Sequence, residues 1–547
     1  MAERPPLELR ISRDPEWMRR PFFTFLFGNL PALVIIVSMV LLYGLFLTHK
    51  IDLVTADLGR HIKNGEVLLD DTSVLERNFY SYTQPDFEVL NHHWGSGFLF
   101  YAAHAAFGLG GAQVLFIVIS LAALAAFIGA ARLYAGWDTI GFVALVALPL
   151  LAERTEIRPE ALSYLFAGLF FLILCIYRES FGSGATSHAL PRTYDRAYAA
   201  KLLWLLPLIE IFWVNSHIYF ILGPLLIGAF IAESLISRRS QLKRLLLVFT
   251  ATVVATIVSP FGYRSLMETV TIFQNYGYRL AENQSVVFMQ RLGGSPNLVL
   301  FELAFGLLII VVAIIMFRNR KSLRPAHLFV GFGLSVMAWL AIRNISLFGL
   351  FFIPLTASLV ESATPATVDR RLASRWAASL LAALLVIFVL FGLQRYFPYW
   401  RQFGIGPEKG NSRAAEFILA NDINGPIFNN YDIGGYLIYH LYPNFPVFVD
   451  NRPEAYPVSF FQDVYILMQE DERVWRQQLE KHGFNSIIFA HRDATPWGQT
   501  FLRSRIFDPS WAPVFADDRV IVFLRRSPDN ESTIRRFEIP RSNFLVR

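Results

Sequence analysis

Ionisable side chains occur at the ends of several apolar segments of this chain, where they could act on a substrate held at a membrane surface. The polar segment 49–95 carries Asp57 and His61, which are four residues apart and would share one face of a helix. Such a pair could hold a divalent metal, or could act as a general base with an orienting partner. A solvated helix face is the structural alternative, and the spacing alone favours it.

The same segment ends in two adjacent histidines, His92 and His93, followed by Trp94. Adjacent residues cannot share one helix face, so a joint metal site would require irregular backbone here. The alternative is that one histidine lines a pocket while Trp94 anchors a short helix at the membrane interface.

A second polar turn holds Arg154, Glu156 and Arg158, followed by Pro159 and Glu160. Two arginines beside a membrane surface could bind a phosphate through charge-assisted hydrogen bonds. Internal pairing with Glu156 and Glu160 is the alternative. Because proline disfavours the helical region for the preceding residue, Arg158 should end an irregular turn.

Three further candidates lie near short connections between apolar segments: Glu210, His217 and Arg343. Glu210 stands two turns before His217 in an otherwise apolar run, where a carboxylate is costly unless it is paired or hydrated. Arg343 taken singly is explained by its side chain reaching the lipid headgroups. Several separate connections contribute ionisable groups to one side, however, and this favours a common site.

The composition of the chain indicates which kind of secondary structure positions these groups. The chain has 547 residues, of which 54% are hydrophobic and 17% charged, and its mean hydropathy is +0.41. Repeated apolar runs of about 20 residues are typical of membrane helices. The single Cys175 excludes a disulfide framework and a cysteine-based zinc site. The formal charge of +6 lies mainly in short basic loops, which argues against nucleic-acid binding.

Basic loops predict the orientation. Arginines precede the first apolar run and recur near 178–201, 238–244, 318–324 and 370–375, so we expect a cytoplasmic N-terminus. The N-terminal arginines are Arg4, Arg10, Arg13, Arg19 and Arg20. About eleven spans follow, near 28–48, 111–134, 138–152, 160–178, 201–214, 217–237, 245–260, 297–317, 325–342, 346–362 and 376–397. Segment 94–107 is too short to cross and predicts an interfacial or re-entrant helix.

The tail after about 400 alternates short apolar strands with helices, which predicts a soluble α/β domain with a largely parallel sheet. The expected strands are 426–428, 446–449, 486–489 and 520–523, and the expected helices are 412–420 and 473–482. Gly434-Gly435 and Gly483 mark turns or helix ends. The tail has no complete phosphate-loop or dinucleotide fingerprint.

Several of these segments together resemble a known family. They are the acid after the first span, Phe79-Tyr80-Ser81-Tyr82-Thr83, Asn91-His92-His93-Trp94, Arg158-Pro159-Glu160, Trp213-Val214-Asn215-Ser216-His217 and Asn430-Tyr431-Asp432-Ile433-Gly434-Gly435-Tyr436. The pattern is similar to that of bacterial GT-C membrane glycosyltransferases, which are related to the protein mannosyltransferases and the aminoarabinose transferases. The resemblance covers most of the chain.

The resemblance implies transfer of a sugar from a polyprenyl-phosphate-linked donor, of the inverting type. It makes Asp57 the essential acid, as general base or metal ligand, with His61 beside it, and makes Arg158, His217 and Arg343 the groups that bind the lipid phosphate. Many relatives carry a second acid where this chain has Leu58, which puts a metal (Mg²⁺ or Mn²⁺) and the exact role of Asp57 in doubt.

The sequence thus predicts a polytopic α-helical membrane domain, residues 1–400 with the outer loop 49–95, and an extracytoplasmic α/β domain, residues 401–547. We expect a bacterial inner-membrane glycosyltransferase acting on an envelope glycan, lipid or protein. Five further residues are expected to line the pocket or contact the acceptor: His92, His93, Arg154, Glu156 and Glu210. A transporter or a non-catalytic envelope assembly scaffold is the alternative; a transporter should carry its ionisable groups near the membrane midplane.

Overall fold

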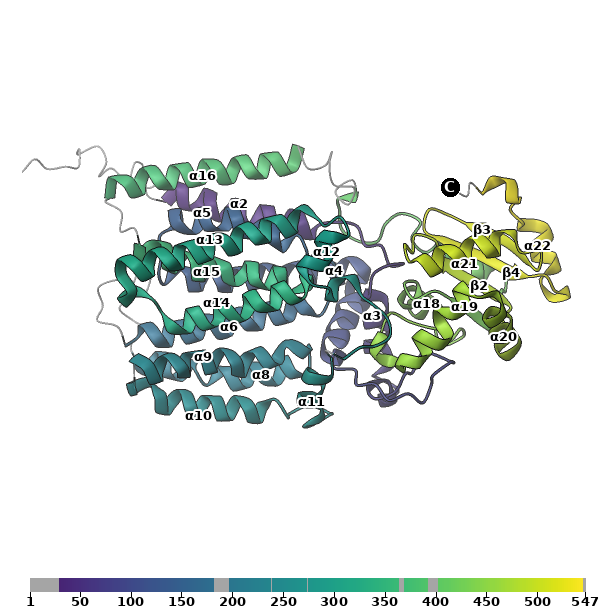
Figure 1. The fold of residues 1–547 in the computed structure, drawn as a ribbon, viewed down its shortest axis with the longest axis horizontal. Helices are drawn as coiled ribbons and strands as arrows, with labels where there is room; N and C mark the ends of the chain where they lie inside the picture. Colours follow the sequence, from purple (N-terminus) through teal and green to yellow (C-terminus); the bar gives the residue numbers. More distant parts are fainter. Residues whose placement is uncertain are drawn as a thin grey trace, which may run out of the picture.

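A bundle of long helices makes up most of the molecule, and the C-terminal region lies at one end of it (Figure 1). The structure is a computed structural model that describes residues 29–181, 196–237, 239–272, 274–363, 368–391 and 402–544. Within these residues each expected span has a helix. The helices are α2 (Leu30–Leu47), α4 (Trp94–Arg132), α5 (Trp137–Leu151), α6 (Glu160–Glu179), α8 (Leu205–Val214), α9 (Leu222–Ser237), α10 (Arg239–Ala255), α13 (Pro296–Asn319), α14 (Pro325–Leu340), α15 (Ile345–Ala363) and α16 (Val368–Phe391).

The helices have the apolar character that a membrane requires. Seven helical segments within the described residues are long and apolar enough to cross it, and three further apolar helices are shorter. Helix α15 lies in the middle of the bundle and is buried along most of its length (Figure 1). The chain is therefore a multi-pass membrane protein. The basic arm Arg4 to Arg20 lies outside the described residues, as do Arg192 and Arg238 of the basic loops.

Helix α4 contains the expected short helix before its membrane-spanning part. The helical conformation breaks at Phe107 (φ −140°) and Gly108 (φ 66°), where a left-handed backbone favours glycine. The segment before the break packs against α3 (Leu58–Val67), and Phe107 is 81% exposed. This arrangement agrees with an interfacial helix followed by a span.

The C-terminal region holds a four-stranded sheet in the order β1-β2-β4-β3. Strands β1 (Ile427–Asn429) and β2 (Ser486–Ala490) are parallel, whereas β4 (Val520–Arg525) is antiparallel to both β2 and β3 (Trp511–Ala516). The predicted largely parallel sheet is therefore wrong. Because β3 and β4 are joined by a short turn, they can form only an antiparallel hairpin.

Segment 446–449, predicted as a strand, is not part of this sheet. It makes an isolated bridge between Val447 and Ser81 of the loop 49–95. The Asn429 side chain forms hydrogen bonds with the backbone of this segment. It accepts from the Phe448 N–H (2.9 Å) and donates to the Val449 carbonyl (2.7 Å). The expected helices are present as α17 (Arg413–Ala420) and α20 (Glu472–His482), and α20 ends at Gly483 with φ 65°.

The C-terminal region packs directly on the loop that follows the first span. Helix α18 (Gly434–Leu441) crosses α3 so closely that a Cβ at Gly59 would lie 3.0 Å from the Gly435 carbonyl oxygen. Arg519 makes ion pairs with Asp52 (3.4 Å) and with Glu408. These contacts hold the region against the end of the bundle where Asp57 lies.

Candidate active site

The ionisable groups singled out in the sequence gather at the end of the bundle that faces the C-terminal region. Asp57 precedes α3, and the turn 152–159 joins α5 to α6. His217 begins the short helix η4 (Ile218–Ile221) before α9, and Arg343 lies in η7 (Ile342–Asn344) between α14 and α15. Successive loops on one side of a bundle must meet at the same end, and this brings the groups together.

Asp57 is held by two partners from distant parts of the chain. One carboxylate oxygen accepts a hydrogen bond from the Asn451 amide, and the other lies 3.5 Å from Arg158 Nη1. Arg60 Nε donates to the Asn451 amide oxygen (3.2 Å), which leaves the amide nitrogen for Asp57. Burial raises the pKa of Asp57, although Arg158 and Arg60 oppose the shift. The carboxylate is therefore more basic than an ordinary aspartate, and its side chain remains 19% exposed.

Two arginines share one carboxylate oxygen beside Asp57. Arg154 Nη1 and Arg158 Nη1 lie 2.7 and 2.8 Å from the same Oε2 of Glu282, in η5 (Ala281–Asn283) of the long connection between α10 and α13. Burial by itself would raise the pKa of Glu282, but Arg158 and Arg154 outweigh it and hold that pKa below its usual range. Glu282 is thus a partly buried anion bound between two guanidinium groups.

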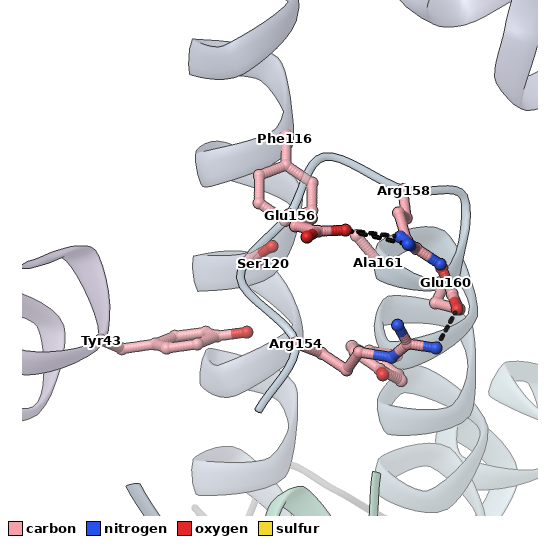
Figure 2. A pocket seen from close by; sticks show the side chains of 9 residues that line it. Tyr43, Phe116, Ser120, Arg154, Glu156, Arg158, Glu160 and Ala161 are labelled. Carbon is pink, nitrogen blue, oxygen red and sulfur yellow. Dashed lines mark hydrogen bonds and ion pairs between the residues drawn. The ribbon is translucent and has the colours of Figure 1, made fainter. Parts of the chain in front are cut away.

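Each arginine also pairs with a nearer acid. Arg158 binds Glu156 at 2.9 Å, and Arg154 binds Glu160 at 3.2 Å, as Figure 2 shows. The internal pairing considered for this turn therefore exists. It does not satisfy the whole cluster, because the buried Nε of Arg154 has no hydrogen-bond partner among the described residues.

A small hollow opens next to these arginines. Arg154, Glu156 and Arg158 form its polar side, and Tyr43 of α2 and Phe116 of α4 contribute aromatic rings (Figure 2). Its cavity volume is only about 10 Å³, which is about the space of one water molecule. In this arrangement it could hold a water molecule but neither a phosphate nor a sugar.

Arg343 has a different environment from the other two arginines. Its Nε donates to the Tyr219 hydroxyl (3.1 Å) and its Nη1 to the Asn283 amide oxygen (2.9 Å). The guanidinium also lies over the Tyr219 ring, 5.6 Å from its centre. Among the residues that the structure describes it makes no ion pair with a carboxylate, so its charge is not neutralised by direct contact.

Four histidines form a cluster beside the acids and arginines. The ring of His93 lies 4.0 Å from that of His92, 5.1 Å from that of His217 and 5.5 Å from that of His61, measured between ring centres. The irregular backbone before α4 allows both adjacent histidines to face the cluster. Burial lowers the pKa of all four, to about 4 for His92 and about 3 for His217. They are neutral near pH 7.

His217 has a defined orientation. Its Nδ1 accepts from the Tyr219 N–H (3.3 Å) and lies 2.8 Å from the Ser163 hydroxyl, which in turn accepts from Trp213 Nε1 (2.8 Å). Since Nδ1 is an acceptor, the proton of the neutral ring is on Nε2. His217 can therefore donate one hydrogen bond to a ligand.

The residues present do not fit a divalent metal. No group of three or more His, Cys, Asp and Glu with suitable geometry occurs among the described residues. The two oxygens of Asp57 face a guanidinium and an amide N–H, and these are donors that a cation would have to displace. The roles of the side chains are therefore derived below without a metal.

Glu210, expected to line the pocket or contact the acceptor, lies inside the bundle. It is fully buried, and its neighbours are Gly223 of α9 and Phe170 of α6. Neither carboxylate oxygen has a hydrogen-bond partner among the described residues. The structure brings the other expected residues into one cluster but leaves this one out.

Four residues of the cluster were missed by the sequence analysis: Glu282, Asn283, Asn451 and Tyr219. Charge balance pointed to no further acid such as Glu282, because Asp57, Glu156 and Glu160 already equal the three arginines in number. Asn451 belongs to the tail, and no spacing in the sequence connects it with Asp57.

Comparison with known proteins gives a likeness of fold. No protein-family model matches the chain, and no curated protein matches it in sequence. The solved structures that resemble it include ArnT from Cupriavidus metallidurans in the apo state, at 15% identity and a TM-score of 0.50, with coverage of 95% of this chain and 99% of that chain.

The archaeal oligosaccharyltransferase AglB from Archaeoglobus fulgidus is also similar. Its complex with an inhibitory peptide and a dolichol-phosphate matches at 13% identity and a TM-score of 0.55, over 89% of this chain and 73% of that chain. A crystal structure of AglB with Zn and sulfate matches at 13% identity and a TM-score of 0.51, over 90% and 73% of the two chains. The chain thus shares its overall fold with these proteins.

Proposed function

Given this fold and the charged cluster at one end of it, we propose that the protein transfers a sugar from a polyprenyl-phosphate-linked donor to an acceptor. The observation that carries the proposal is the direct contact between Asp57 and Arg158 at the end of the bundle. A group able to take a proton and a group able to bind a phosphate thus lie side by side. A transporter would need such groups near the membrane midplane instead.

The arginines supply the phosphate-binding chemistry. Glu282 Oε2 already sits between Arg154 and Arg158, as one oxygen of a phosphate would. Arg343 binds only neutral acceptors, so it can engage a phosphate without giving up a carboxylate. The Nε2–H of His217 can add a neutral hydrogen bond. That AglB was solved with a dolichol-phosphate supports a lipid phosphate as the ligand.

Asp57 supplies the base. In a single displacement the acceptor hydroxyl oxygen forms a bond to the anomeric carbon while the bond from that carbon to the phosphate oxygen breaks. Asp57 takes the hydroxyl proton, and the polyprenyl phosphate leaves with the bonding electrons and the negative charge. Arg158 and Arg343 stabilise that charge as it develops. Attack from the side opposite the phosphate inverts the anomeric configuration.

The arrangement in the cell follows from the loops. We infer that residues 1–400 form the membrane-embedded transferase unit and residues 401–547 an extracytoplasmic domain, in a bacterial inner membrane. The basic loops support a cytoplasmic N-terminus. An envelope glycan, lipid or protein is the acceptor class, because Asp57 contacts the C-terminal region, which we infer to be extracytoplasmic.

Binding of decaprenyl phosphate by the full chain in lipid nanodiscs tests the proposal. We expect decaprenyl phosphate to raise the Tm, because a ligand of the folded state stabilises it, and decaprenol without phosphate to leave the Tm unchanged. Equal effects of the two lipids, or no effect of either, would overturn the proposal. Cysteine labelling in whole cells should find positions 60–90 accessible from outside and the loop near 320 protected.

A further inference from the structure

A row of exposed apolar side chains follows one face of α11 (Arg264–Thr271). Tyr263, which directly precedes the helix, is 70% exposed, Met267 is 60% exposed and Val270 is 72% exposed. Residues spaced by four and then three positions lie on one face of a helix. Single exposed apolar residues are common on proteins, but three large ones on one face of a short helix indicate a contact surface.

The other sides of α11 are already occupied. Arg264 forms an ion pair with Glu88 of the loop that follows the first span. The Ser265 hydroxyl lies 2.7 Å from that of Ser259. Leu266 packs against the core of the bundle, and the helix also contacts η4. The position of α11 is therefore fixed by contacts with the protein, while its apolar face is left open in the described structure.

The open face of α11 continues the exposed apolar side of α10. Helix α10 lies at the edge of the bundle, and α11 lies beside its end, on the side that faces the C-terminal region (Figure 1). Val254 in the last turn of α10, and Ile257 and Val258 just after it, are exposed apolar residues. Tyr263 follows a few positions later, and tyrosine is enriched where the hydrocarbon of a membrane meets the headgroups. Helix α11 therefore begins where a membrane interface is expected.

The same pattern occurs at the other end of the connection between α10 and α13. Helix α12 (Val286–Arg291) exposes Val287, and Leu292 directly after the helix is also exposed. Val299 in the first turn of α13 continues this apolar surface into a membrane helix. Both ends of the connection therefore join the exposed apolar side of a membrane helix, which binding to a single soluble partner would not require.

We propose that the face formed by Tyr263, Met267 and Val270 binds the bilayer in which the bundle lies. Helix α11 is then an interfacial helix, whose apolar face rests on the lipid acyl chains just below the headgroups, on the side of the candidate site. Lipid rather than a soluble protein is the partner, because the face adjoins α10, where lipid already surrounds the bundle. This inference does not depend on the transferase function.

The lipid contact of α11 affects the segment that reaches the arginine cluster. After α11 the chain continues to Tyr278, which stacks on Tyr431 of the C-terminal region with ring centres 4.3 Å apart. Glu282 and Asn283 follow, and they bind the arginines of the candidate site. This segment is therefore attached to the bilayer through α11 and to the C-terminal region through Tyr278.

Spin labelling of the full chain in lipid nanodiscs tests this contact. Met267→Cys and Val270→Cys each provide a site for a nitroxide label, and the wild type should take up none because its Cys175 is fully buried. Oxygen concentrates in lipid and a nickel chelate in water, so the ratio of their collision rates with the label reports its depth. We expect the ratio at both positions to lie between those of two controls. Leu247→Cys, exposed in the middle of α10, is the membrane control, and Phe507→Cys, 56% exposed in the C-terminal region, is the matched control in water.

Two results would overturn the proposal. Collision ratios at Met267→Cys and Val270→Cys equal to that of Phe507→Cys would mean that the face lies in water. Few collisions with either reagent would mean that protein covers the face. Magnetic coupling between the labels of two molecules in one nanodisc would then identify a second copy of the chain as the partner, and its absence would identify another segment of the same chain.

Discussion

Helix α6 has a buried arginine cluster at each of its ends, and the two clusters differ in how well they are satisfied. At the C-terminal end Arg178 Nε donates to Glu233 Oε1 (2.7 Å), and the other oxygen of Glu233 accepts from the Ala326 N–H (3.1 Å) at the start of α14. At the N-terminal end Arg154 and Arg158 compete for a single oxygen of Glu282.

This difference indicates a structural role for the cluster at Glu233 and a functional role for the cluster at Glu282. At the Glu233 end each carboxylate oxygen has its own donor, and the cluster joins α6, α9 and α14. At the other end Arg154 Nε, His61 Nδ1 and His92 Nε2 are buried without a partner among the described residues. Unmade hydrogen bonds of buried groups reduce stability, so an end that keeps several of them is prepared for a ligand.

The largest effect is expected from Asp57→Asn. Asparagine keeps the shape of aspartate but cannot take a proton from the acceptor, so sugar transfer should fall by roughly 10²–10⁴-fold. The Tm and the affinity for decaprenyl phosphate should stay close to those of the wild type. Transfer at the normal rate would contradict the catalytic role of Asp57. It would also contradict the functional role of the cluster at the N-terminal end of α6.

The opposite result is expected at the other end of α6. Glu233→Ala breaks a buried ion pair, which typically costs about 3–5 kcal/mol, so the Tm should fall markedly. Where the variant folds at low temperature, its affinity for decaprenyl phosphate should match that of the wild type. A fall in lipid phosphate affinity without a fall in Tm would show that this cluster is not purely structural.

Arg343→Ala should weaken the binding of decaprenyl phosphate about ten- to a hundredfold, because a charged hydrogen-bond donor contributes about 1.5–3 kcal/mol. The Tm without ligand should change little, since Arg343 binds only neutral acceptors. Arg264→Ala is the matched control, because this arginine pairs with the exposed Glu88 and Glu76 instead. Equal affinities of Arg343→Ala and the wild type would contradict the assignment.

Glu282→Gln should have the smallest effect on the affinity for decaprenyl phosphate, and it should raise that affinity rather than lower it. Removing the anion that Arg154 and Arg158 share leaves both guanidinium groups available, so decaprenyl phosphate should bind up to about tenfold more tightly. Glu153→Gln is the control, because Glu153 binds Asn297 and no arginine in the described structure. Weaker binding in Glu282→Gln would mean that Glu282 positions the arginines rather than standing where the phosphate binds.

The sequence was sufficient for the parts that depend on local rules. Apolar run lengths predicted the helices of the bundle, and alternation of loops across it brought Asp57, Arg158, His217 and Arg343 to one end. Contacts made by chain folding over long distances were not predictable, such as that of Asn451 with Asp57. The prediction of a strand at 446–449 was wrong because the Asn429 side chain, rather than a neighbouring strand, forms hydrogen bonds with the backbone of this segment. The alternation of hydrophobic residues does not indicate such a side-chain contact.

The bond between Asn451 and Asp57 joins residues 394 positions apart, and this has a consequence for biosynthesis. At a synthesis rate of about 5–20 residues per second, Asn451 is made roughly 20–80 s after Asp57. During that interval the nascent membrane bundle carries the carboxylate without the amide that orients it. The chain therefore cannot assemble its complete site until the C-terminal region has been made and folded, so an unfinished molecule lacks the group that orients Asp57.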